Sequence, residues 1–138
     1  MRWIVPLVVT AVVFGTLDLL WLGWLGRPLY DERLGHLMAP TFDMTAAFAF
    51  YALYVAGVTY FVTVPALTEG SLTKAALSGA FLGLLAYGTW NLVNLSVVKD
   101  FPASIAPIDM AWGTIATAAT AVVTYLVCRA LPFYDTAA

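Results

Sequence analysis

Charged side chains are scarce in this sequence. Of its 138 residues, 10% are Asp, Glu, Lys or Arg and 62% are hydrophobic, whereas soluble domains have about 25% charged and about 45–50% apolar residues. A small domain folded in water could not hide so much apolar surface. Intrinsic disorder is also excluded, because it requires low hydrophobicity and high charge. The composition therefore predicts a single integral membrane domain over residues 1–138.

Cationic and metal-ligating residues are equally few. The chain has six Lys and Arg residues and a net charge of −2, so it lacks the clustered basic surface that nucleic-acid binding requires. The single cysteine, Cys128, cannot form an internal disulfide, and the single histidine, His36, has no second His or Cys at metal-ligand spacing. We therefore expect no nucleic-acid partner, no metal site and no cofactor.

Four segments are long and apolar enough to cross a bilayer, which takes about 20 residues in a helix. They cover roughly residues 3–25, 41–64, 72–98 and 106–131, and Pro65 and Pro132 are expected to end the second and fourth. The alternation typical of a transmembrane β-strand is absent from these runs. One longer loop over residues 26–40 and two short turns connect them. This pattern predicts an all-α, antiparallel four-helix transmembrane bundle with both termini on the same side.

The direction of insertion depends on the cationic residues near the ends of the spans. Three fall on each side of the predicted bundle: Arg2, Lys74 and Arg129 against Arg27, Arg33 and Lys99. The charges therefore balance. A positive residue before the first span usually stays in the cytoplasm, so we predict that both termini are cytoplasmic.

Small residues on the third predicted span indicate close helix packing. Gly79 and Gly83 are separated by four residues, a spacing that lets two backbones approach closely in lipid. We expect this face to make the closest contact inside the bundle. A seam between two copies of the chain is the alternative interpretation of the same pattern.

Four polar residues lie inside the predicted spans, namely Asp18, Asn91, Asn94 and Asp109. An ionisable side chain there costs about 2.5–3.5 kcal/mol on insertion scales and usually marks a functional site. With a rise of 1.5 Å per residue, all four lie about 8–12 Å from the same end of the bundle. We therefore expect them to converge near one membrane face, with the loop over residues 26–40 as the nearest cover.

Aromatic residues surround this predicted polar layer. Tyr87 falls on the same helical face as the two asparagines, and Tyr51 or Tyr54 is expected to approach from the second span. Most other Trp and Tyr residues, Tyr30 among them, suit interfacial belts. Three tryptophans near the layer are alternative pocket-lining residues: Trp21, Trp90 and Trp112.

The sequence also resembles a known family. Five segments carry the resemblance: DLLWLG from Asp18, FYxxY from Phe50, VPA from Val64, AYGTWNLVNL from Ala86 and DMxWG from Asp109. Together they are similar to the domain-of-unknown-function 2177 family of small bacterial membrane proteins. The resemblance implies a bacterial origin and the four-helix plan, and it implies no established activity. In that family we expect an acidic residue at the position of Asn91, so a site that depends on that carboxylate would be altered here.

These observations leave several functions open. The first is an inner-membrane protein that binds or handles a small lipophilic molecule, such as a lipid, an isoprenoid or a quinone-like ligand. Its polar end would meet Asp18, Asn91, Asn94 and Asp109, and its apolar body would meet a group of aromatic side chains: Tyr51, Tyr87, Trp90 and Trp112.

The second is an accessory subunit of a larger membrane complex, or a homo-oligomer, in which the polar layer is structural and fixes helix register. The third is a lipid-modifying enzyme that uses Asp18 and Asp109 as acid and base, although no recognised catalytic motif accompanies them. Proton or ion conduction is a further interpretation of the same layer.

Overall fold

The computed structural model describes residues 1–132 and 134. The α-helices in this part of the chain are α1 (Ile4–Leu20), α2 (Arg27–Leu34), α3 (Met44–Val58), α4 (Val64–Glu69), α5 (Leu72–Val97) and α6 (Ala106–Ala130). Together with intervening π-helical turns they form four segments that are long and apolar enough to cross a membrane: Ile4–Leu25, Met44–Glu69, Leu72–Val97 and Ala106–Ala130. The predicted all-α four-span fold is confirmed.

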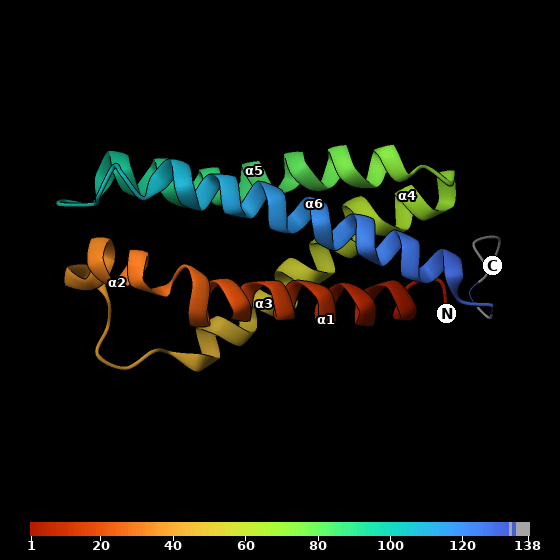
Figure 1. Ribbon diagram of the computed structural model, residues 1–138, viewed down its shortest axis with the longest axis horizontal. Helices are drawn as coiled ribbons and strands as arrows, with labels where there is room; N and C mark the ends of the chain where they lie inside the picture. The colour runs from red at the N-terminus through yellow and green to blue at the C-terminus, as the bar shows by residue number, and fades with distance from the viewer. Residues whose placement is uncertain (133, 135–138) are drawn as a thin grey trace.

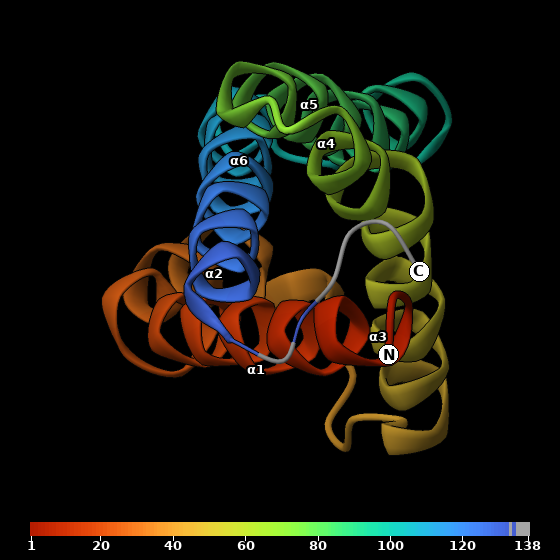
Figure 2. The ribbon, with the colours of Figure 1, turned by 90° about the vertical axis from the view of Figure 1, so that its right-hand side faces the viewer.

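The four spans run alternately up and down. The N-terminus and the last turn of α6 lie at one end of the bundle, and α2 lies at the other (Figure 1). The view from the terminal end shows α5 and α6 side by side, α1 next to α6, and α3 with α4 on the remaining side (Figure 2). The contact between α5 and α6 is the most extensive in the molecule.

The second span does not end at Pro65, contrary to the sequence-based prediction. It continues as α4 to Glu69, where Gly70 adopts φ 64° and terminates the helix in a left-handed conformation. Pro65 occupies the first turn of α4, and the preceding residues Thr59–Thr63 form a π-helical turn. A proline has no N–H and crowds the carbonyl four residues earlier. The wider π turn changes the hydrogen-bond register just before it, so the span can continue.

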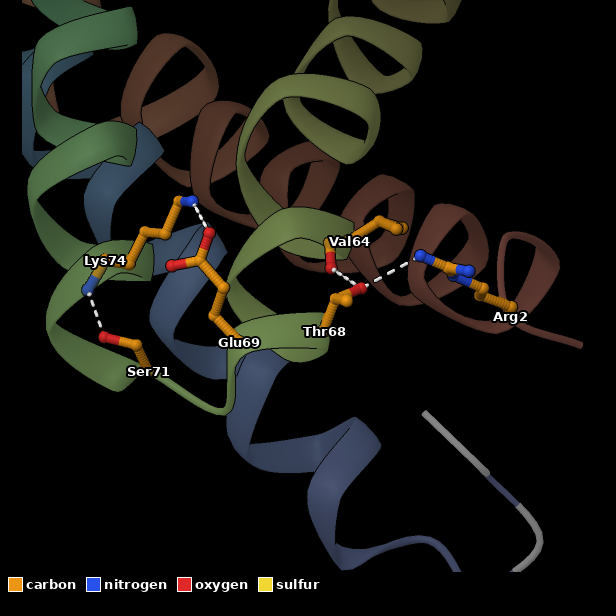
Figure 3. A network of polar contacts seen from close by, with 6 residues as sticks. All are labelled: Arg2, Val64, Thr68, Glu69, Ser71 and Lys74. Carbon is orange, nitrogen blue, oxygen red and sulfur yellow. Dashed lines mark hydrogen bonds and ion pairs between the residues drawn. The ribbon is translucent and has the colours of Figure 1, made fainter. Parts of the chain in front are cut away.

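Polar contacts join the helices at the terminal end of the bundle (Figure 3). The Ser71 hydroxyl accepts a hydrogen bond from the Lys74 backbone N–H at 3.1 Å and so caps α5. The Lys74 ammonium pairs with Glu69 across the short turn. Arg2 donates to the Thr68 hydroxyl at 3.1 Å, and this bond connects the start of the first span to the end of the second.

The connection expected to be a loop over residues 26–40 contains the helix α2 and a 3₁₀ turn, Gly35–Leu37. Pro28 lies in the first turn of α2, where its missing N–H costs nothing. Tyr30 and Leu34 follow at a spacing of four residues and are the buried positions of the helix. This segment therefore packs a defined side-chain face against the end of the bundle.

Gly79 and Gly83 lie against α6. A Cβ atom at Gly83 would stand 2.2 Å from the Gly113 carbonyl oxygen, and one at Gly79 would stand 3.0 Å from the Ala118 Cα atom. Only residues without a side chain permit such an approach of two backbones. Both glycines are buried within one chain, so this face serves the internal contact rather than an exposed seam.

We predict that Gly83→Ala destabilises the protein by about 1–3 kcal/mol, because the added methyl group overpacks the contact between α5 and α6. Gly15→Ala is the matched control, since a Cβ atom there meets no other atom within 4 Å. This control should be neutral or stabilising by up to about 1 kcal/mol through helix propensity. Thermal unfolding in a mild detergent measures both, and equal midpoints for the two variants would contradict the proposed contact.

Candidate intramembrane polar site

Two buried carboxylates lie at the α2 end of the bundle. Asp18, on α1, is 3% exposed and Asp109, on α6, is 8% exposed. Asp109 occupies the first turn of its helix, where the helix dipole favours a negative charge. Asp18 lies far from the N-terminus of α1, so its carboxylate is stabilised by side-chain partners alone.

Asp109 is held from two other elements. The Asn91 side-chain amide on α5 donates to Oδ2 of Asp109 at 2.6 Å and also to the Tyr87 carbonyl at 2.8 Å. The Tyr30 hydroxyl on α2 donates to Oδ1 and accepts a hydrogen bond from the Trp21 indole N–H at 3.0 Å. The chain of contacts therefore joins the end of the first span, α2, α5 and α6 at one carboxylate.

Asp18 has fewer close partners. The Tyr51 hydroxyl on α3 donates to Oδ2, and the Trp112 indole N–H on α6 contacts Oδ1 at 3.4 Å, long for a hydrogen bond. Within residues 1–132 and 134, the ion pairs are Arg27 with Asp31 and Lys74 with Glu69. Neither buried carboxylate is therefore neutralised by a cationic side chain from this part of the chain.

Aromatic rings frame the two acids. The Trp21 and Trp112 rings stack with centroids 4.6 Å apart. Tyr87 lies over Gly113, where a Cβ atom would stand 2.1 Å from its ring. Because Gly113 has no side chain, the Tyr87 ring of α5 occupies the space next to the Gly113 backbone on α6.

Both carboxylates face a cavity of about 480 Å³. Its lining comes from five helices and the π turn after α1: Asp18, Leu22, Tyr30, Leu34, Ala47, Phe50, Tyr51, Ala86, Tyr87, Trp90, Asp109 and Trp112. Phe50 on α3 and Trp90 on α5 are 46% and 48% exposed. The cavity therefore reaches the outer surface of the bundle beside these two residues.

The structure brings most of the predicted site residues together. Asp18, Asp109 and the four predicted aromatic residues line the cavity, and Asn91 bonds to Asp109 behind it. Asn94 does not join them. It is half-buried and lines a separate outer groove with Leu37 and Phe101. Three residues of α-helix rotate its side chain by about 60° from the direction of Asn91, and it lies one turn nearer the helix end.

Tyr54 lies one turn deeper than Tyr51 and serves a different contact. Its hydroxyl meets the Thr117 hydroxyl at 2.7 Å. Thr10 and Thr124 make a similar contact at 3.4 Å further toward the terminal end. Pairs of hydroxyl groups thus connect α1 and α3 to α6 between the carboxylates and the terminal end of the bundle.

Comparison with known families gives one match. A family model described as "Predicted membrane protein (DUF2177)" matches residues 3–126. The chain belongs to this family. No curated protein and no solved structure shows a significant match. The matched range of the DUF2177 family includes both carboxylates and all of the residues that line the cavity.

Tyr30 is the site residue of this DUF2177 protein that sequence reasoning missed. The prediction assigned it to an interfacial belt, whereas it is buried and bonded to Asp109. Burial raises the pKa of the Tyr30 phenol, and the hydrogen bond to Asp109 raises it further. The hydroxyl therefore remains a donor at neutral pH. The signal was its spacing of four residues from Leu34 after Pro28, which indicates a helical buried face.

We predict that Tyr30→Phe destabilises the protein by about 1–3 kcal/mol, because the buried Asp109 loses one of its two hydrogen-bond donors. Tyr60→Phe is the matched control, since Tyr60 is 61% exposed and its hydroxyl has no partner among the described residues. Thermal unfolding in detergent compares the two. If Tyr30→Phe unfolds at the same temperature as Tyr60→Phe, the contact with Asp109 contributes nothing to stability.

Proposed function

We propose that this protein binds or handles a small lipophilic molecule in the cavity between α1, α2, α3, α5 and α6. The observation that carries the proposal is the pairing of buried carboxylates with an apolar cavity that reaches the outer surface of the bundle. Asp18 and Asp109 line it together with several aromatic rings. A purely structural polar layer would not require a cavity beside it.

The size and chemistry of the cavity support this proposal. Small-molecule sites are usually concave volumes of about 300–1,000 Å³, mostly apolar, with a few placed polar groups. The cavity of about 480 Å³ falls in this range. Its polar groups are the two carboxylates and tyrosine hydroxyls, and they lie at the α2 end.

The position of the opening supports a lipophilic ligand. Phe50 and Trp90 are about half exposed beside it, and both belong to helices that are long and apolar enough to span a membrane. An entrance between such helices faces lipid acyl chains, so a ligand dissolved in the bilayer could enter without crossing water. Its polar end would meet Asp18 and Asp109, and its apolar body would lie against Tyr51, Tyr87, Trp90 and Trp112.

The proposal includes a cellular setting. The family resemblance supports a bacterial inner membrane as the location, and Arg2 before the first span supports cytoplasmic termini. In that orientation the carboxylates would lie in the outer leaflet, and α2 would face the periplasm. Ligand exchange would then occur with the periplasmic half of the bilayer.

We predict that Ala47→Phe removes ligand binding, because the added ring occupies cavity volume while the sequence keeps both carboxylates. Ala49→Phe is the matched control: Ala47 lines the cavity, whereas Ala49, on the same helix, is exposed. Each protein is purified from its native membrane in a mild detergent, extracted with organic solvent and analysed by mass spectrometry.

A lipophilic compound present in near-stoichiometric amount in the wild type and in Ala49→Phe, and lost in Ala47→Phe, would support the proposal. The same extracted compounds in equal amounts from all three proteins would contradict it. A larger native mass containing an unrelated subunit, with no compound specific to the cavity, would favour the accessory-subunit interpretation instead.

A further inference from the structure

We infer that the polar end of the ligand is an organic cation, a protonated amine without an adjacent phosphate. This inference rests on the proposed function and specifies its ligand class. Asp18 and Asp109 both line the cavity, and no cationic side chain of residues 1–132 and 134 pairs with them. A buried charge without a partner of opposite sign is costly. A bound cation would supply that partner.

The hydrogen-bonding groups around the acids also call for a donor on the ligand. The donors nearest the carboxylates, from Tyr30, Tyr51 and Asn91, are already engaged with them. Asn91, which lies behind the cavity lining, is 0% exposed and its Oδ1 atom has no hydrogen-bond partner among the described residues. An ionised carboxylate has about four acceptor sites, and each aspartate uses only two. The site is therefore rich in free acceptors.

The aromatic lining supplies the second element that ammonium groups favour. Tyr51, Tyr87, Trp90 and Trp112 border the same cavity as the carboxylates. The face of an aromatic ring attracts a cation, and cages of such rings recognise quaternary ammonium groups. Carboxylates at one end of an aromatic cavity fit an amphipathic ammonium better than a neutral alcohol or a quinone.

Two other occupants that carry a positive charge, a calcium ion and a phospholipid headgroup, fit this cavity less well. A calcium ion requires about six to eight oxygen ligands, whereas most residues that line this cavity are aromatic or aliphatic. A zwitterionic phospholipid headgroup would bring a phosphate close to the two carboxylates, and like charges placed together repel each other. These comparisons favour an amphiphile with a protonated amine over a phospholipid.

Asp18 is the principal anchor for the cation. Asp109 is bound at 2.6 Å by Asn91 and also by Tyr30. Asp18 has Tyr51 as its one close donor, since the Trp112 contact is 3.4 Å long. The Oδ1 atom of Asp18 therefore has the most capacity to accept a hydrogen bond from a ligand.

The test measures binding of three probes with the same alkyl chain to the full protein in maltoside micelles. The probes are dodecylammonium, 1-dodecanol and dodecylphosphocholine, each radiolabelled and followed by equilibrium dialysis. We expect saturable binding of dodecylammonium that is about 10- to 100-fold tighter than binding of the other two, as for a hydrogen bond to a charged group.

Asp18→Asn should remove this preference while retaining the affinity for 1-dodecanol, which shows that the variant is folded. Asp109→Asn is the second variant, with a smaller expected loss. Asp31→Asn is the control, because Asp31 is paired with Arg27 at the surface, with an exposed side chain, and should change nothing.

The outcomes separate the two proposals. Equal affinity for dodecylammonium and 1-dodecanol, both abolished by Ala47→Phe, would overturn the cation inference and leave the lipophilic cavity intact. Tighter binding of dodecylphosphocholine than of dodecylammonium would also overturn it and assign a phospholipid. Dodecylammonium binding that Ala47→Phe does not reduce would contradict both the cation inference and the proposed function.

Discussion

The cost of burying two carboxylates in the apolar part of a membrane protein governs the organisation of this bundle. Asp18 and Asp109 come from the first and last spans, and side chains from four helices contact them. Tyr51 reaches from α3, Asn91 from α5, Tyr30 from α2, and Trp112 from α6. Each donor lowers the cost of burial. Together they connect α1, α2, α3, α5 and α6 at this end of the bundle.

Close backbone packing makes this convergence possible. Without a hydrophobic driving force between helices in lipid, small residues determine which helices approach most closely. Gly79 and Gly83 bring α5 onto α6, and Gly113 leaves room for the Tyr87 ring. The same contact brings Asn91 within hydrogen-bond distance of Asp109. Helix α3 makes little contact with α5 or α6, and residues of all three helices line the cavity.

Much of the fold was predictable, because it follows from hydrophobic length. Runs of about 20 apolar residues must span as helices, and constant rise per residue places polar residues at a calculable depth. For that reason the carboxylates and Asn91 could be assigned to one layer before their contacts were known. The continuation past Pro65 could not, because it depends on a π turn at Thr59–Thr63, which no residue type specifies.

The side-chain partners were harder to predict than the layer. Asn94 was assigned to the same layer as Asn91 but points elsewhere, because an estimate of depth ignores rotation about the helix axis. Tyr30 was missed because tyrosine near a span end usually marks the membrane interface. Its actual role depends on α2 packing against the start of α6 at the end of the bundle, a tertiary contact that local sequence does not specify.

The central claim is that the two carboxylates face one cavity built to hold a lipophilic molecule. An experimental structure of the protein purified from its native membrane and kept in a lipid nanodisc tests it most directly. The account predicts elongated density between α3 and α5, with one end within hydrogen-bond distance of Asp18 or Asp109. A cavity closed by the side chains of α3 and α5, or either carboxylate turned outward to lipid, would contradict it.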